Sequence, residues 1–402
     1  MYALIVTWPG GGATQPALGL GRLLAARGHD VRILGPAAIE ARVIAAGCSF
    51  RPYPYDLELA GRDLDAQWDY IVDTLLLGPG LPAAIRAELK AGPADVVIVD
   101  YILRSAASEV ELVGRPWALL VHMAYAHHSG RPAPDPEARL GPTWYLRRIN
   151  EVRASIGLEA LPMGPNRATV AMAARAPLTL VAMPSEFDIW PSPPPSVLHV
   201  GPLVEESPAQ RPWTGPWAEG DARPLVVVSL GSTYMRQEAV LGRIGEALSR
   251  LAVRVLLLTG FDLQPDELPA FAPSVTVQSY VPHGAVLPQA ALVVTHAGMG
   301  TLMAAFAAGV PMVCLPLGRD QGVNAARAEA LGVSLTLDSD ASAEAIGMIV
   351  ERALSSKEMR RASEGLARAI RSYGDGRLAV EAVERLAALR RRRTIDDFAL
   401  KG

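Results

Sequence analysis

One stretch in the second half of the chain constrains the fold more than any other feature. Residues 292–295 have an apolar strand pattern, and His296 and a glycine turn follow directly. A helix is expected from about residue 301 to Gly309, and a second strand over 312–315. A glycine turn lets backbone N–H groups approach a ligand closely, and the helix end after it favours negative charge. The pattern therefore predicts a phosphate site with a histidine beside it.

The chain begins with the same alternation. A strand is expected over 3–8, a glycine loop over 9–12, a helix over 16–27 and a strand over 31–34. This order is typical of a doubly wound sheet. A dinucleotide fingerprint is not expected at this turn, because Gln15 stands where its third glycine would fall. We therefore expect neither NAD nor FAD there.

The domain organisation follows from a change of composition. Residues 205–223 are polar and proline-rich, which is typical of a linker. We predict an α/β fold of two doubly wound, Rossmann-like domains that face one another across a cleft. The other expected strands are 95–99, 117–121, 178–182, 225–230, 253–258 and 275–278. The expected parts are an acceptor-binding domain over 1–204, the linker over 205–223, a nucleotide-binding domain over 224–372, and a C-terminal helix over 373–402 that packs back on the first domain.

Charge and hydropathy exclude several classes of protein. The formal net charge of −3 argues against a nucleic-acid surface. No apolar run approaches the roughly 20 residues that a membrane span needs. The first residues, MYALIVTWPGGG, lack the basic leader of a signal peptide. We therefore expect a cytoplasmic protein without a transmembrane segment.

The residue types that bind metals are not arranged as ligands. Cys48 and Cys314 are the only cysteines, and both lie in apolar sequence. The seven histidines show no metal-ligand spacing. The sequence Asp63-Leu64-Asp65 has the form of a metal-binding DxD motif, but it lies in the half expected to bind the acceptor, so we attribute it to chance. We predict no metal site.

Five motifs in the second half occur together in a specific order. They are SLGST at 229–233, YVPH at 280–283, THAGMGT at 295–301, GVPMVCLP at 309–316 and RDQGVNA at 319–325. With the two-domain pattern, they resemble the family-1 glycosyltransferases of GT-B fold, above all the bacterial branch that glycosylates antibiotics and other natural products. The resemblance implies inverting transfer of a sugar from a TDP-sugar or UDP-sugar to a hydroxyl of a hydrophobic aglycone. The nucleotide sugar is then a co-substrate, and no metal is implied.

The resemblance assigns the donor site to the second half. His296 and the start of the following helix are expected to stabilise the negative charge of the departing pyrophosphate. Ser232 would approach the phosphates, residues 281–283 would hold the base, and Asp320 with Gln321 would bind sugar hydroxyls. The expected donor-binding residues are Gly231, Ser232, Thr233, Val281, His283, His296, Gly298, Met299, Gly300, Thr301, Asp320 and Gln321.

The first half departs from the family pattern at the general base. Family members commonly carry His or Asp in the glycine loop after the first strand, where this chain has Ala13 or Thr14. Neither can act as a base near neutral pH. Asp100, which matches a family carboxylate at a strand end, could take the proton, and so could a histidine of the same region. Those histidines are His122, His127 and His128. Alternatively, an acidic acceptor such as a phenol needs little help, or catalysis is weak.

We favour Asp100 or His122 as the base and expect His296 to be catalytic on the donor side. A second departure is Ala304, which stands where related enzymes often place a ribose-binding Glu and so favours a TDP-sugar. The alternative function is a non-catalytic protein of the same fold that binds sugar nucleotides or natural products. A homodimer is compatible with either function. Acceptor contacts are expected from Trp8, Gly12, Ala13, Thr14, Trp68, His122 and Tyr125.

Overall fold

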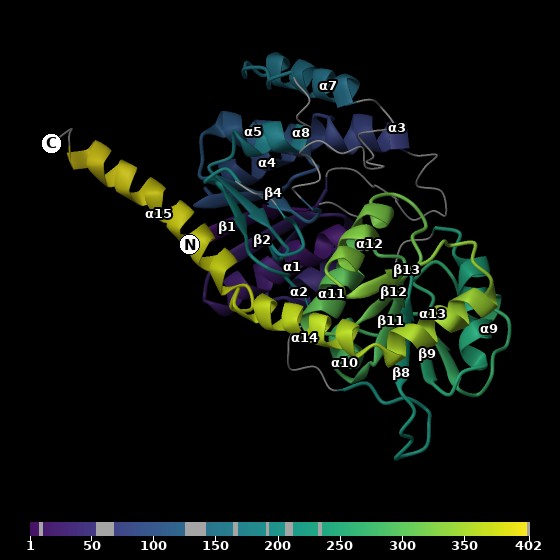
Figure 1. Cartoon of the computed structure of the whole chain (residues 1–402). Coiled ribbons are helices and arrows are strands. Elements are labelled where there is room, and N and C mark those ends of the chain that lie inside the picture. The colour runs from purple at the N-terminus through teal and green to yellow at the C-terminus, as the bar shows by residue number, and fades with distance from the viewer. Residues whose placement is uncertain are drawn as a thin grey trace. The chain divides into compact units, whose positions relative to one another are not determined.

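The chain forms two compact units. The computed structural model describes residues 1–7, 11–53, 68–124, 142–163, 168–189, 193–205, 212–231 and 235–399. One unit comprises Met1–Glu205 with Tyr373–Gly402, and the other comprises Glu206–Ser372. Each unit contains a parallel sheet with helices packed against it (Figure 1). The predicted α/β class, with two doubly wound, Rossmann-like units, is confirmed.

Within the described residues, the sheet of the first unit has seven strands in the order β3-β2-β1-β4-β5-β6-β7. All neighbouring strands are parallel. The chain winds outward from β1 in one direction and from β4 in the other, so the topology switches between these two strands. In such sheets, ligands bind at the carboxyl ends of the strands beside the switch point. The strands are β1 Tyr2–Val6, β2 Asp30–Gly35, β3 Ser49–Pro52, β4 Val96–Asp100, β5 Trp117–Val121, β6 Leu178–Val181 and β7 Val197–His199.

The last helix of the chain completes the core of the first unit. Val380 and Val383 of α15 are buried in the same apolar cluster as Leu18 of α1 and Ile5 of β1. These side chains recur at helical spacing on one face, which is why α15 packs against the sheet. The described helices of this unit are α1 Gly11–Ala26, α2 Glu40–Ala45, α3 Trp68–Ile71, α4 Gly80–Ala91, α5 Arg104–Val113, α7 Pro142–Ser155, α8 Ala168–Ala173 and α15 Arg377–Ala399, with the short 3-10 helix η1 Ala37–Ile39 and the π-helix η2 Val72–Leu76.

The start of α1 corrects one prediction. A helix was expected from about residue 16 because proline suits a first helical turn, but α1 begins at Gly11 and contains Pro16. Proline has no backbone N–H, so its place in α1 costs one intrahelical hydrogen bond. Gly12 and Ala13 therefore belong to the first turn of a helix and not to a glycine loop.

The second unit repeats the architecture. In its described part, a sheet of six strands has the order β10-β9-β8-β11-β12-β13, and every neighbouring pair is parallel. The topology switches between β8 and β11. The strand predicted over 292–295 is β11, with the same bounds. The strands are β8 Leu225–Ser229, β9 Arg254–Leu258, β10 Val275–Gln278, β11 Leu292–Thr295, β12 Met312–Cys314 and β13 Ser334–Thr336.

Helices α9 and α13 pack together over one face of this sheet, and α11 packs against α14 (Figure 1). Ile244 of α9 and Ile346 of α13 share an apolar cluster with Val294 of β11. The helices are α9 Glu238–Ser249, α10 His283–Val286, α11 Met299–Ala308, α12 Gln321–Ala330, α13 Ala343–Ser355 and α14 Lys357–Arg371, with the short turns η4 Pro265–Glu267 and η5 Leu287–Gln289.

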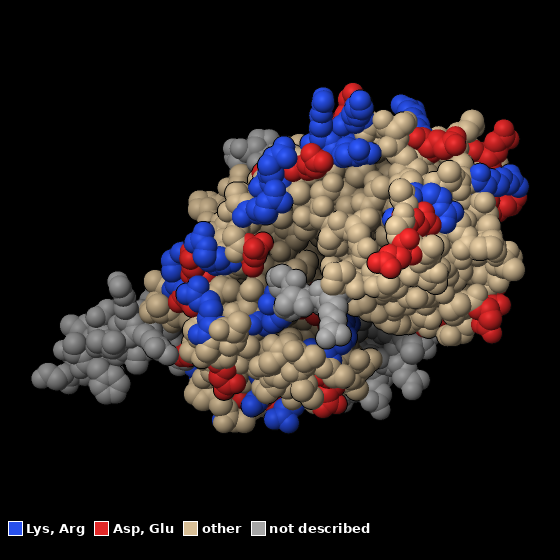
Figure 2. Space-filling view, turned by 90° about the horizontal axis from the view of Figure 1, so that it is seen from below, with Lys and Arg blue, Asp and Glu red and all other residues tan. Residues whose placement is uncertain are grey.

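The surface agrees with the modest net charge. On the face shown in Figure 2, apart from its grey residues, basic and acidic side chains lie interspersed between broad uncharged areas. Among the described helices, none is long and apolar enough to cross a membrane.

Candidate functional site

The predicted donor residues gather at the carboxyl ends of β8 and β11. These strands are neighbours, with Ser229 beside Thr295 in register. The chain leaves β8 through Gly231 and leaves β11 through His296. The switch point of the second sheet therefore holds the predicted histidine. Ser232 and Thr233, also predicted here, lie outside the described residues.

Two glycines enclose the ring of His296. Only 8% of this residue is exposed. A Cβ added at Gly231 would lie 2.8 Å from the imidazole Nε2, and one added at Gly298 would lie 2.3 Å from the same atom. Gly231 also has φ of +91°, which side chains rarely adopt. Both glycines therefore provide the space that the imidazole occupies, a reason for glycine that the sequence motif did not give.

His296 is neutral at physiological pH. The backbone N–H of Gly298 donates to Nδ1 at 3.4 Å, so Nε2 carries the ring proton and is the donor. Burial lowers the pKa of His296 to about 3, helped by the charges of Arg319 and His283. The imidazole can thus donate one hydrogen bond to a phosphate oxygen, but it does not supply a full positive charge.

The low pKa of His296 predicts a pH dependence of folding. Its folded pKa of about 3 lies below the ordinary 6.5, so the unfolded chain takes up a proton first as the pH falls. Its contribution to stability is complete above about pH 6.5, and lowering the pH to 5 should remove about 2 kcal/mol. The free energy of unfolding can be measured in urea at both pH values. We expect its loss to be about 2 kcal/mol larger in the wild type than in His296→Gln, because glutamine cannot take up a proton. Equal losses in the two proteins would contradict a buried neutral imidazole.

His283 is a second histidine near His296, at the carboxyl ends of β8 and β11. Its Nε2 lies 3.3 Å from the hydroxyl oxygen of Ser229, at the end of β8. Burial lowers the pKa of His283 to about 4, so this ring is also neutral. Val281, predicted to hold the base with His283, is buried just before Pro282, the N-cap of α10.

The start of α11 is arranged to receive an anion. Its N-cap is Gly298, which has no side chain that could cap this end. The first turn contains Met299, Gly300 and Thr301, all predicted donor residues. Backbone N–H groups in a first helical turn have no partner within the helix, and the helix dipole favours negative charge there.

Asp320 and Gln321 begin α12, but their side chains serve different partners. Asp320 is the N-cap residue, yet its carboxylate caps no backbone N–H. It accepts instead from Nδ2 of Asn324 at 2.8 Å. The Gln321 carbonyl accepts from the backbone of Leu317 at 2.7 Å and of Gly318 at 3.1 Å. The Gln321 Nε2 also donates to Sδ of Met235 at 3.1 Å. Gln321 therefore holds its own loop and has one amide N–H left for a sugar, a restriction that the motif did not predict.

In the first unit, the structure joins two residues that the sequence offered as alternatives. Nδ1 of His122 lies 3.0 Å from Oδ2 of Asp100, an ion-pair distance, although neither atom forms a hydrogen bond that meets geometric criteria among the described residues. The other carboxylate oxygen accepts from the backbone N–H of Ile102 at 3.0 Å. Asp100 ends β4 beside the switch point, and His122 follows the neighbouring strand β5. A carboxylate at Nδ1 favours the tautomer whose Nε2 can accept a proton.

Tyr101 packs against the His122 ring of this pair. Its ring meets the imidazole of His122 edge to face, with centroids 4.9 Å apart. The guanidinium of Arg104 lies over the same tyrosine ring at 5.3 Å. Aromatic contacts of this geometry orient a ring. Neither residue was singled out from the sequence, because only the fold brings them beside His122.

The other predicted acceptor contacts are less informative. Thr14 is fully buried in α1. For Gly12, Ala13 and Trp68 the structure describes the backbone alone. Trp8, Tyr125, His127, His128 and the sequence Asp63-Leu64-Asp65 lie outside the described residues. Over the described ranges, no group of three or more His, Cys, Asp or Glu is placed to hold a metal ion.

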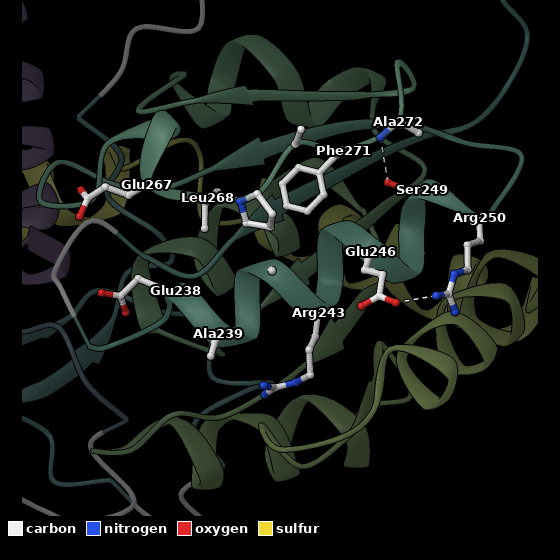
Figure 3. A pocket seen from close by; sticks show the side chains of 13 residues that line it. Glu238, Ala239, Arg243, Glu246, Ser249, Arg250, Glu267, Leu268, Phe271 and Ala272 are labelled. Atoms are coloured by element: carbon white, nitrogen blue, oxygen red, sulfur yellow. Dashed lines mark hydrogen bonds and ion pairs between the residues drawn. The ribbon is translucent and has the colours of Figure 1, made fainter.

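A groove of about 740 Å³ lies elsewhere in the second unit, between α9 and residues 267–272 (Figure 3). Polar groups of the residues that line it form hydrogen bonds within the protein. The backbone N–H of Ala272 donates to the hydroxyl of Ser249 at 3.2 Å, and Arg243 donates to the carbonyl of Ala341 at 3.0 Å. Phe271 packs on Gly245, where a Cβ would lie 2.3 Å from its ring. The residues that line the groove include none predicted for the site.

Comparisons with known proteins agree with this arrangement. Residues 250–386 match the family described as "Erythromycin biosynthesis protein CIII-like, C-terminal domain". Demethyllactenocin mycarosyltransferase of Streptomyces fradiae is 27% identical over 402 residues, covering 94% of this chain and 85% of that protein. The glycotransferase of kitacinnamycin superposes with a TM-score of 0.77 at 25% identity, covering 96% of this chain and 99% of that one. The glycosyltransferase VinC, solved in complex with dTDP, superposes with a TM-score of 0.73 at 20% identity, covering 96% of this chain and 100% of that one.

These relatives are named as glycosyltransferases, which favours an enzyme over a non-catalytic binding protein. The chain is a glycosyltransferase of GT-B fold, similar in sequence and structure to glycosyltransferases of bacterial natural-product pathways.

Proposed function

We propose that this enzyme transfers the sugar of a TDP-sugar to a hydroxyl of a hydrophobic aglycone in one inverting displacement, without a metal ion. The pairing of His122 with Asp100 carries the proposal. A direct displacement needs a base on the acceptor side and a charge-stabilising site on the donor side. The acceptor would bind to residues 1–204 and the donor to 224–372, with 205–223 as the linker and 373–402 returning to the first domain.

His122 is the general base in this proposal. Its Nε2 takes the proton of the acceptor hydroxyl as the acceptor oxygen bonds to the anomeric carbon and the bond from that carbon to the phosphate oxygen breaks. Asp100 orients the imidazole through Nδ1 and stabilises the positive charge that it gains. Attack from the face opposite the leaving group inverts the anomeric configuration. The pair thus replaces the base that is missing at Ala13.

The donor side stabilises the departing nucleoside diphosphate. The neutral imidazole of His296 donates its Nε2–H to a phosphate oxygen, and the first turn of α11 adds backbone N–H groups. The helix dipole contributes further positive potential at the same place. Because these groups offset the charge that develops on the leaving group, a divalent cation is not required. Asp320 would bind sugar hydroxyls, and Gln321 would donate to a sugar oxygen.

The choice of TDP rests on Ala304 and on the dTDP bound to the related VinC. A ribose 2′-hydroxyl needs a partner when it is desolvated, and Ala304 offers none. In binding titrations with TDP-glucose and UDP-glucose, Ala304→Glu should lower the ratio of the UDP-glucose to the TDP-glucose Kd about tenfold, the scale of one charged hydrogen bond. An unchanged ratio would contradict the ribose argument.

The reaction class is tested with the same donors and a panel of phenolic and aliphatic aglycones. We expect NMR of the product to show an inverted anomeric centre and EDTA to leave the rate unchanged. Retention of configuration would contradict a single displacement, and a rate restored only by added metal would contradict the role given to α11. The proposal also places the enzyme in the cytoplasm, as a monomer or homodimer that sedimentation would distinguish.

A further inference from the structure

A buried amide connects the two loops of the donor site. Asn324 lies on α12 with no exposed surface. Its Nδ2 lies 2.8 Å from Oδ2 of Asp320 and 3.1 Å from the backbone carbonyl of Ala297. Both partners are acceptors, so the two N–H groups of one amide join the loop after β12 to the loop after β11.

The two loops meet because β11 and β12 are parallel neighbours, with Thr295 beside Cys314 in register. Each loop contains a residue other than glycine in the left-handed region. Ala297 has φ of +65°, and Arg319, directly before Asp320, has φ of +56°. Such conformations persist only where surrounding contacts hold them. Asn324 supplies such a contact to Ala297 itself and to the neighbour of Arg319.

The partners of the amide indicate what Asn324 contributes. Its Oδ1 has no hydrogen-bond partner among the described residues, whereas both N–H groups of Nδ2 have one. A buried polar atom without a partner is costly, so packing alone would favour an apolar side chain here. The pair of donors is therefore the property that an apolar residue could not replace.

We propose that Asn324 is a positioning residue that holds the Asp320 carboxylate at a fixed place relative to the pyrophosphate loop of residues 296–298. The sugar and its leaving group are then held by one rigid element, and the sugar hydroxyls find their acceptor already oriented. Asn324 itself does not contact the donor. This inference rests on the proposed contact of Asp320 with the sugar.

A double-mutant cycle tests the coupling. The Kd values of TDP and TDP-glucose are measured by calorimetry for wild type, Asp320→Ala, Asn324→Ala and the double variant. We expect Asp320→Ala to raise the Kd of TDP-glucose about 30-fold, within the range of hydrogen bonds to a charged group. Asn324→Ala should raise it about tenfold, and the double variant should stay within about twofold of Asp320→Ala. The Kd of TDP should change less than about threefold throughout, because TDP lacks the glucose that Asp320 is proposed to bind.

Each outcome has a distinct meaning. Equal weakening of TDP and TDP-glucose by Asn324→Ala would overturn the inference, because Asn324 would then only support the pyrophosphate loop. Additive losses in the double variant would overturn it as well. If Asp320→Ala left the TDP-glucose Kd unchanged, the proposed contact of Asp320 with the sugar would be refuted, and this inference would be refuted with it. Failure of the wild type to bind TDP would refute the donor proposal instead.

Two further variants separate positioning from folding. Asn324→Ser leaves a smaller cavity and keeps one donor, so its Kd for TDP-glucose should lie between those of wild type and Asn324→Ala. Asn150 is a matched control in the first unit, where its side chain donates to the carbonyl of Leu161 at 3.0 Å and accepts from its N–H at 2.7 Å. Asn150→Ala should lower the melting temperature without changing the ratio of the two Kd values. A change in that ratio as large as that of Asn324→Ala would overturn the assignment.

Discussion

Replacing His122 with phenylalanine is expected to lower kcat about 1,000-fold, within the range that general bases contribute. Phenylalanine keeps a flat ring beside Tyr101 but cannot accept a proton. The KM values of donor and acceptor should change little, because the base is needed mainly in the transition state. Steady-state kinetics with TDP-glucose and a phenolic acceptor measure the effect.

The chain offers a matched control for this substitution. His199 also pairs with a buried carboxylate of the first unit, since its Nε2 lies 2.8 Å from Oδ2 of Asp188. It ends β7 at the sheet edge, away from the switch point between β1 and β4. His199→Phe should therefore lower stability but keep the wild-type kcat. If His122→Phe retained more than a tenth of the wild-type kcat, the proton would have to leave by another route.

Loss of the donor-side histidine should be nearly as severe. His296→Ala is expected to lower kcat/KM about 100-fold, the scale of removing one donor that stabilises a developing negative charge. Gly298→Ala should have a similar effect although it removes no polar group. Its Cβ would lie 2.3 Å from Nε2 and would displace the imidazole. The same kinetic assay measures both variants, and circular dichroism checks that they fold.

Gly347 provides the control for the glycine substitution. It lies in α13, and a Cβ there would meet no atom within 4 Å. Gly347→Ala should keep full activity and stabilise the protein by about 0.5–1 kcal/mol, since alanine favours a helix. Wild-type activity in Gly298→Ala would show that the position of the imidazole is not important for transfer.

The predictability of the fold depended on how apolar each element is. Strand β11 was predicted with its observed bounds because its four residues are all buried and a histidine and a glycine turn end it. Strand β3 was missed because none of its residues is fully buried, so no apolar pattern marks it. Strands β7 and β13 were missed because only the first of their three residues is buried, whereas all three residues of β12, which was predicted, are buried. The start of α1 was misplaced because the preference of proline for first turns outweighed the glycines before it.

The site divides in the same way. The motif around His296 is continuous in sequence, so its residue types indicated a phosphate site before any contact was known. Asp100 and His122 come from the ends of two different strands, so no single motif contains both. Their roles stay predictions that the experiments above test. Asn324 stands four residues after Asp320 within a motif, and helical spacing could have suggested their contact. Its hydrogen bond to Ala297 could not be predicted from spacing, because it joins α12 to the loop after β11, which is distant in sequence.

The sequence by itself determined the sheet class, the two-unit pattern and the chemistry offered by the turn after β11, because these depend on local periodicity and on residue types within one short segment. The tertiary structure alone decided that Asp100 and His122 form one pair, that Gly231 and Gly298 make room for a neutral His296, and that Asn324 joins two loops. Each of these contacts depends on which strands lie side by side, and strand order is set by the packing of the whole sheet.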